Sequence, residues 1–222
     1  LRKVGVFYPF WRKIFKKADR VQVISRYLKE FAVRHGAVCP IWINPNGVDL
    51  AMYQMKKEEY KEGSAFKIIT TSRLVKKNGI DVLIRAIAET ADSNIALRIL
   101  GSGPEETELK KLASNLGISK KIEFLGSVDP DLIPEYLSKA NLFVRSSRSE
   151  GLGNSFLEAM AAGLPIIGTN VGGIPDFLTD GVTGLFANVE DVKDLANKIV
   201  KLKTDRALRE KIALSGQRMV QE

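Results

Sequence analysis

The chain has 222 residues, 45% of them hydrophobic, so it can bury the core of one large domain and leave room for part of another. Its net charge of +8 does not indicate a nucleic-acid partner, because residues 1–20 carry seven basic side chains against one acidic side chain, a local balance of +6. Cys39 is the single cysteine, no His or Cys spacing is typical of zinc, and no apolar run has membrane-spanning length. We therefore expect no disulfide, no metal site and a cytoplasmic location.

The basic segment at residues 1–20 also contains large apolar side chains, namely Phe7, Tyr8, Phe10, Trp11, Ile14 and Phe15. A basic, aromatic stretch of this kind can rest on an anionic membrane surface, which would make the protein peripheral on the cytoplasmic face of a membrane. The same side chains can instead pack against protein that this sequence does not contain. We favour packing and keep the membrane contact as the alternative.

The next stretch predicts a small unit of two strands and a helix. Apolar strands are expected at residues 20–25 and 40–44, around a helix over residues 26–35 that Ser25 can cap. Residues 51–64 are polar and charged, so we expect a solvated connector that carries no chemistry.

From residue 66 onward, apolar strand runs alternate with amphipathic helices. The expected strands cover residues 66–72, 95–101, 121–126, 141–147, 164–169 and 184–186, and the expected helices cover residues 79–91, 104–117, 130–140, 154–162, 190–205 and 207–220. This alternation predicts an α/β fold, a Rossmann-like parallel sheet with helices on both faces. Right-handed crossovers place the loops that follow the strands along one edge of that sheet, where we expect one ligand site.

The stretch from Arg145 to Asp176 carries the most specific pattern. Glu150 projects from a loop broken by glycines, and Glu158 lies in the helix that starts near Asn154. The N-terminus of that helix exposes the backbone N–H groups of residues 152–155 and bears partial positive charge. The two acids therefore flank a place suited to an anion or an oxygen-rich ligand.

Other loops on the same edge supply cations and glycines. Arg73 can grip phosphate oxygens as a fork, and Lys77 can add a point charge. The Gly-Ser-Gly-Pro turn at residues 101–104 is followed by three glutamates that would repel a pyrophosphate, so we reject a nicotinamide-dinucleotide site there. The sequence contains no P-loop pattern, which argues against a common type of ATPase.

Five segments in this order carry a family resemblance. They are PNGVD at 45–49, TSRLVKKNG at 71–79, ILGSGP at 99–104, FLGSV at 124–128 and EGLGNSFLEAMAAGLPIIGTNVGGIPD at 150–176. Together they resemble the donor-binding domain of the retaining glycosyltransferases of family 4, which is the C-terminal half of a GT-B fold. The resemblance implies transfer of a hexose from a UDP-, GDP- or ADP-sugar to a carbohydrate or lipid-linked acceptor, in polysaccharide or glycolipid biosynthesis, without a cofactor or metal.

The resemblance also implies residue roles at the reacting end of the donor. Glu150 contacts hydroxyls of the transferred sugar near the reacting carbon, and the backbone N–H groups of Leu152, Gly153 and Asn154 complete the sugar contacts. Arg73 and Lys77 neutralise the leaving diphosphate. The family places its lysine five residues after the arginine, whereas this chain has Lys76 and Lys77 one position or more early, so either lysine is a candidate for the phosphate contact.

Further donor-binding roles follow from the same resemblance. Glu158 accepts hydrogen bonds from the ribose hydroxyls, the side chains of Asn154 and Ser155 tune the sugar, and the backbone at Val128 meets the edge of the base. Glycines that let the backbone lie close to the donor are Gly101, Gly172 and Gly173, and the last two serve the geometry of a turn equally well.

The resemblance implies two domains of unequal completeness. Residues 1–48 correspond to the end of the N-terminal, acceptor-side domain plus the hinge, and residues 49–222 correspond to the nucleotide-sugar-binding domain. Because the chain starts at Leu1 and the family has a longer N-terminal domain, we expect a fragment that binds donor but transfers little sugar alone. Two alternatives stay open: a nucleotide-sugar epimerase of the same architecture, and a non-catalytic carbohydrate or membrane-surface module.

Overall fold

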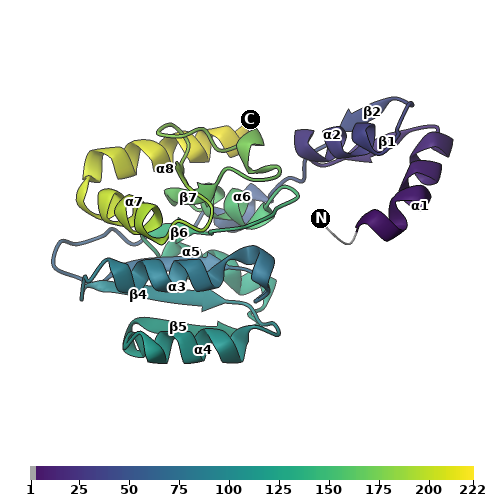
Figure 1. The fold of residues 1–222 in the computed structure, drawn as a ribbon. Coiled ribbons are helices and arrows are strands. Elements are labelled where there is room, and N and C mark those ends of the chain that lie inside the picture. The colour runs from purple at the N-terminus through teal and green to yellow at the C-terminus, as the bar shows by residue number, and fades with distance from the viewer. Residues whose placement is uncertain (1–3) are drawn as a thin grey trace. The chain divides into compact units, whose positions relative to one another are not determined.

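The computed structural model describes residues 4–222, which fall into two compact units that divide between Asn46 and Gly47 (Figure 1). The first unit contains helix α1 (Val4–Lys17), strand β1 (Val21–Val23), helix α2 (Arg26–Arg34) and strand β2 (Ile41–Ile43). β1 and β2 form a parallel pair, and the hydroxyl of Ser25 accepts a hydrogen bond from the Leu28 N–H, as a helix cap does.

Helix α1 is an element for which the sequence analysis gave no secondary structure. Trp11 and Phe15 stack on one another with ring centroids 5.8 Å apart, and both meet the edge of Phe31 on α2. Part of the aromatic set therefore packs within the chain itself. Phe7, Phe10 and Ile14 remain exposed, and Arg2 and Lys3 of the same basic segment lie outside the described residues.

The second unit is built on one parallel sheet of six strands in the order β5-β4-β3-β6-β7-β8. The strands are β3 (Phe66–Thr71), β4 (Ile95–Leu100), β5 (Ile122–Gly126), β6 (Leu142–Val144), β7 (Ile166–Thr169) and β8 (Leu185–Ala187). The main helices are α3 (Ile80–Glu89), α4 (Glu106–Asn115), α5 (Ile133–Ser138), α6 (Asn154–Ala161), α7 (Val192–Thr204) and α8 (Arg206–Gln221). The predicted fold class, a Rossmann-like parallel sheet covered by helices, is confirmed.

The apolar strand runs form the core because both faces of the sheet are covered. Ile68 on β3 lies beside Leu97 on β4 and Leu142 on β6, and all three side chains are buried. Helix α3 packs against α4 and α7, whereas α6 packs against α8. A sheet that is buried on both faces needs nearly continuous apolar strands, which is the pattern that the sequence shows.

The strand order creates a switch point between β3 and β6. The chain moves from β3 to β4 and β5 in one direction, then returns to β6 on the other side of β3 and continues to β7 and β8. Right-handed crossovers then send the helices after β3 and after β6 to opposite faces of the sheet. The crevice at the carboxyl ends of two such strands is where ligands bind in open α/β sheets. The loops after β3 and β6 are the ones that contain Arg73 and Glu150.

The connector at residues 51–64 is not the solvated linker that the sequence predicted. A short 3₁₀ turn occupies Leu50–Tyr53, and further on the Lys57 ammonium donates a 2.8 Å hydrogen bond to the Gly163 carbonyl. Tyr60 packs edge-on against Phe66 at the start of β3. The segment is therefore partly buried against the sheet domain. Its polar composition does not reveal these contacts, so the sequence predicted a solvated linker.

Along the described part of the chain, from Val4 onward, no helix has both the length and the apolar character that crossing a membrane requires.

Candidate functional site

The loops after β3, β4 and β5 are fastened to one another at the carboxyl edge of the sheet. Gly101 has a φ of +128°, and a Cβ there would overlap the carbonyl oxygen of Ser72. The Leu74 N–H donates to the Ser102 carbonyl at 2.9 Å, and the hydroxyls of Ser102 and Ser127 lie 2.8 Å apart. Gly101 thus allows close packing between neighbouring loops, and Val128 follows Ser127 as a half-buried residue.

Asn78 joins the loop after β3 to the loop after β6. Its side-chain Nδ2 donates to the Arg73 carbonyl at 2.6 Å, and its Oδ1 accepts a 3.1 Å hydrogen bond from Arg145 Nη2. Asn78 and Arg145 are both buried. One amide side chain therefore spans the switch point between β3 and β6 and connects Arg73 with the glutamate side of the site.

Arg145 and Glu150 form an ion pair within the loop after β6. Arg145 Nη2 lies 2.8 Å from Glu150 Oε2, and the two side chains are only 10% and 11% exposed. Arg145 Nη1 also donates to the Ser155 hydroxyl at 2.7 Å. Burial lowers the pKa of Arg145, while the charges of Glu150 and Glu158 oppose that shift. The guanidinium is therefore held by acceptors from three places: Asn78, Glu150 and the first turn of α6.

This pair leaves unused bonding capacity. Glu150 Oε1 accepts a 3.2 Å hydrogen bond from the Gly151 N–H, and Oε2 lies 2.8 Å from Arg145 Nη2, so each carboxylate oxygen can still accept a further hydrogen bond. Arg145 Nε has no acceptor within residues 4–222. Buried polar atoms are normally paired, so the unpaired Nε and the remaining acceptor capacity of Glu150 mark a place where a hydroxyl-bearing ligand can complete the bonding.

The N-terminus of α6 opens beside this pair. Gly153 has a φ of +98° and precedes the helix, which starts at Asn154 as predicted. The backbone N–H groups of Leu152 and Gly153 donate to no acceptor in the described part of the chain, although the Leu152 side chain is buried. These N–H groups can bind an oxygen-rich ligand, as the sequence predicted for this helix start.

Glu158 lies one turn into α6 and is half-buried. Burial raises the pKa of its carboxyl group, and the charge of Arg145 partly offsets that rise. Tyr53 lies in the turn before the sheet. Burial, and then the charge of Glu158, raise the pKa of Tyr53 to about 12. Among residues 4–222, the Glu158 carboxylate has no hydrogen-bonded partner that would compensate its burial.

Gly172 and Gly173 pack against the backbone of Glu150. Gly172 has a φ of +58°, and a Cβ there would overlap the Glu150 carbonyl oxygen; the Gly173 N–H donates to that same oxygen at 3.3 Å. The structure thus uses these glycines to hold the loop that carries Glu150. Their proposed contact with a donor remains a prediction.

Arg73, Lys76 and Lys77 present exposed side chains, whereas their backbone is fixed. The Arg148 N–H donates to the Lys77 carbonyl at 2.7 Å, and the Arg148 guanidinium donates to the Lys76 carbonyl. Arg148 also binds Asp81 through two hydrogen bonds of 2.8 Å. Across residues 4–222, no carboxylate lies within ion-pair distance of Arg73 or Lys77, so both cations are available to an anion.

The residues that connect the site were not predicted from the sequence. Arg145, Asn78, Arg148 and Tyr53 were given no role. A signal existed for Arg145, because a charged residue that directly follows a buried strand must find a partner. No comparable signal existed for Asn78, since its contact depends on β3 and β6 being neighbours. As for metals, the described residues contain no group of three or more His, Cys, Asp or Glu side chains placed to hold an ion.

Comparison with protein families gives one clear match. The model of the family described as glycosyl transferases group 1 matches residues 53–219. The chain is 31% identical over 211 residues to the GDP-mannose-dependent alpha-(1-6)-phosphatidylinositol monomannoside mannosyltransferase of Mycolicibacterium smegmatis, covering 87% of this chain and 55% of that protein. The chain thus spans about half the length of the curated relatives it matches.

Solved structures give the same architecture. The Anabaena protein HepE in complex with UDP and glucose superposes with a TM-score of 0.86 at 22% identity, over 96% of this chain and 62% of that one. Sucrose-phosphate synthase from Thermosynechococcus elongatus superposes with a TM-score of 0.88 at 24% identity, over 97% of this chain and 57% of that one. At this identity the likeness establishes the fold, which matches glycosyltransferases of the GT-B type.

Replacing Gly172 by alanine tests the packing that holds Glu150. Gly172→Ala should lower the free energy of unfolding by about 1–3 kcal/mol more than Gly181→Ala, because both positions have positive φ but only Gly172 is pressed against another backbone. Urea titration of the two variants measures the difference. Equal losses would contradict the close approach of residues 172 and 150.

Replacing Glu158 by glutamine tests the burial of its charge. A raised pKa means that the folded state disfavours the carboxylate, so Glu158→Gln should raise the free energy of unfolding at neutral pH. The difference in free energy of unfolding between the variant and the wild type should shrink as the pH falls through the raised pKa, because the wild-type carboxyl then becomes neutral. Urea titrations over that range check it, with the exposed Glu62→Gln as control. A glutamine variant that is less stable at neutral pH would refute the assignment.

Proposed function

The chain belongs to the glycosyl transferases group 1 family, and from that premise we propose that it is the C-terminal, donor-binding domain of a retaining hexosyltransferase. One observation carries the proposal. Arg145 binds Asn78, Ser155 and Glu150 and thereby connects the loops after β3 and β6. Exposed cations, backbone N–H groups and two acids lie on these loops and at the start of α6. A nucleotide sugar needs this set of partners, because it combines a diphosphate with two groups of hydroxyls.

The diphosphate is assigned to the loop after β3. Arg73 provides a planar fork and Lys77 a point charge, and their lack of carboxylate partners in the described chain supports this role. Arg148 fixes the backbone under the lysines, so the cations start from a defined turn. Negative charge that builds on the leaving diphosphate is stabilised there without further reorganisation of the loop.

The sugar and the ribose are assigned to the loop after β6 and to α6. Glu150 and the N–H groups of Leu152, Gly153 and Asn154 bind hydroxyls of the transferred sugar, and the lack of an acceptor for the Leu152 and Gly153 N–H groups within the described chain supports that assignment. Glu158 accepts from the ribose hydroxyls, which would compensate the cost of its burial. The base lies against the backbone at Val128.

The reaction that these groups serve is transfer with retention. The bond between the anomeric carbon and the diphosphate oxygen breaks, and an acceptor hydroxyl forms the new bond on the same face of the sugar. The acceptor proton leaves with the diphosphate. The chain supplies charge stabilisation through Arg73 and Lys77 and holds the sugar in place at Glu150.

The names of relatives guide the choice of substrates. The Mycolicibacterium relative is named as dependent on GDP-mannose and as acting on a phosphatidylinositol monomannoside, and HepE was solved with UDP. We propose a UDP-, GDP- or ADP-hexose as donor, and a sugar or glycolipid hydroxyl as acceptor. With an acceptor of the second kind, the exposed apolar side chains of α1 would meet the cytoplasmic face of a membrane.

The relatives are longer than this chain, and we propose a division of labour on that basis. Residues 49–222 bind the donor, whereas residues 1–48 belong to the acceptor side. The chain alone then binds nucleotide sugar but transfers little of it, because groups that hold the acceptor lie in the part of the relatives that it does not match.

Calorimetric titration of the chain with UDP-glucose, GDP-mannose and ADP-glucose tests this function. At least one donor should bind, with and without EDTA, and Arg73→Gln should weaken that binding about tenfold or more, since a charge-assisted hydrogen bond contributes roughly 1.5–3 kcal/mol. Arg218→Gln, exposed on α8, is the matched control.

Two outcomes would count against the proposal. Absence of binding by all three donors would favour a non-catalytic module, and equal affinity of Arg73→Gln and wild type would remove the diphosphate assignment. With a longer form of the protein, product analysis separates transfer from its nearest rival, because an epimerase yields an isomerised nucleotide sugar and no new glycoside.

A further inference from the structure

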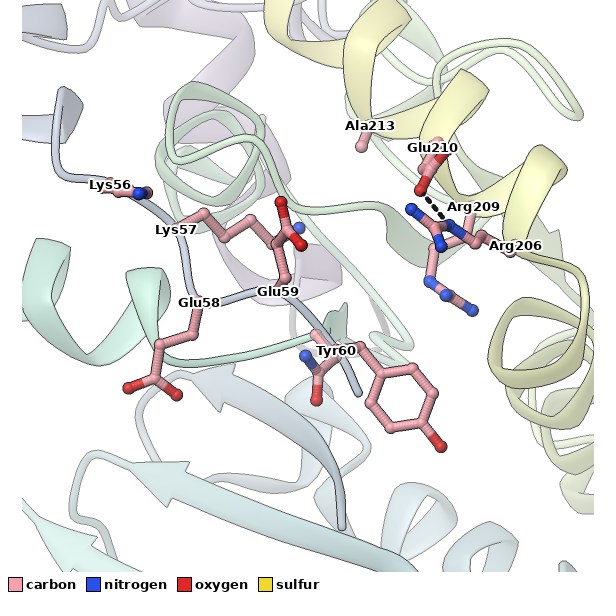
Figure 2. Close-up of a pocket in the computed structure, with 10 residues that line it drawn as sticks. Lys56, Lys57, Glu58, Glu59, Tyr60, Arg206, Arg209, Glu210 and Ala213 are labelled. Carbon is pink, nitrogen blue, oxygen red and sulfur yellow. Dashed lines mark hydrogen bonds and ion pairs between the residues drawn. The ribbon is translucent and has the colours of Figure 1, made fainter. Parts of the chain in front are cut away.

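A cavity lies at the opposite edge of the sheet from the candidate donor site. It has a volume of about 350 Å³ and lies between residues 56–60 and α8 (Figure 2). Asn141, which lines it, directly precedes β6, and Tyr60 packs on the first residue of β3. The cavity is thus near the amino ends of these strands, so a ligand there is separate from one held by the loops that follow them.

Lys57 supplies one cation to this cavity. Its Nζ donates to the Gly163 carbonyl at 2.8 Å, which uses one of the three N–H donors of the ammonium group. Among residues 4–222 no carboxylate lies within ion-pair distance of it. Burial, and then the positive charge of Arg209, lower the pKa of Lys57 to about 8. The protein therefore holds this lysine in a place that disfavours its charge.

Arg209 supplies a second cation from α8. Its Nη1 donates to the carbonyls of Leu202 and Lys203, both at 2.8 Å, and its guanidinium lies over the ring of Tyr60 at 5.3 Å. The other N–H groups of the fork have no acceptor in the described chain. Arg209 is thus oriented by carbonyls and a ring while part of its donor set remains free.

Within the described residues no acid forms an ion pair with Lys57 or Arg209, although the charge of Glu210 partly offsets the lowering of both pKa values. Figure 2 shows Lys57 and Glu58 on the segment before β3, and Arg206 and Glu210 on α8, where a dashed line joins the last two. Glu210 accepts from Arg206 at 2.6 Å, and Glu58 is bound to Lys67 at 2.8 Å. The remaining charged groups at the rim, Lys56 and Glu59, are exposed and of opposite sign.

We propose that this cavity binds a phosphate group between Lys57 and Arg209. Two like charges that are partly desolvated and that form no ion pair with a carboxylate of the described chain repel one another, and an anion between them lowers that cost. A guanidinium fork with a lysine point charge is the combination that suits a phosphate. The volume is at the lower end of small-molecule sites, so it admits inorganic phosphate or a phosphomonoester the size of a sugar phosphate.

Titration of the chain with inorganic phosphate and, separately, with glucose 6-phosphate tests the site. Both the wild type and Lys61→Met, an exposed control from the same segment, should bind saturably, whereas Lys57→Met should bind about tenfold or more weakly. Arg73→Gln should leave this binding unchanged, because Arg73 belongs to the other edge of the sheet. Tighter binding of glucose 6-phosphate than of phosphate identifies an organic phosphate as the ligand, and equal binding identifies the inorganic ion.

The same site can be followed in the wild-type protein, independent of how variants fold. With lysine side chains labelled for NMR, phosphate should raise the pKa of the Lys57 ammonium, since an added negative charge favours its charged form. Loss of phosphate binding in Arg73→Gln but not in Lys57→Met would assign the phosphate to the donor site and overturn the inference. An unchanged Lys57 titration at saturating phosphate would overturn it as well.

Discussion

The buried guanidinium of Arg145 is the contact on which the candidate site depends. It binds Glu150 in its own loop, Asn78 from the loop after β3 and Ser155 at the start of α6. Breaking a buried pair by removing one partner costs about 3–5 kcal/mol, because the other charge is left unpaired. One side chain therefore connects the loop after β6 and the start of α6 with the distant loop after β3, and it does so where the N–H groups of Leu152 and Gly153 have no acceptor in the described chain.

The strand order makes this contact possible. β6 lies beside β3 although two strands intervene in sequence, so the loops that follow them meet where the chain reverses its direction across the sheet. Glycines let the loops approach: Gly101 lies against Ser72, and Gly172 lies against Glu150. The crevice at such a reversal is open to ligands, and the cations of the loop after β3 border it. The strand order, the glycines and the buried Arg145 cation thus together bring the loops of the candidate site into contact.

Much of the sheet domain could be predicted from the sequence, because its strands are continuous apolar runs and its helices are amphipathic. The candidate loops were predictable as well, since each follows a strand. Asn78 and Arg145 were not, because their pairing requires the strand order, which local periodicity does not encode. Lys57 was taken for a solvated residue since composition cannot show that a polar segment folds back onto Gly163. Helix α1 was missed because its aromatic residues have a partner, Phe31, that lies beyond the local pattern.

The central claim is that the loops after β3, β5 and β6 form one donor site, and backbone amide NMR tests it most directly. During titration with UDP or GDP, the account predicts that amides of residues 72–79, 126–128 and 150–158 shift together, with one shared affinity. Shifts confined to residues 56–60 and α8, with residues 72–79 and 150–158 unmoved, would contradict it.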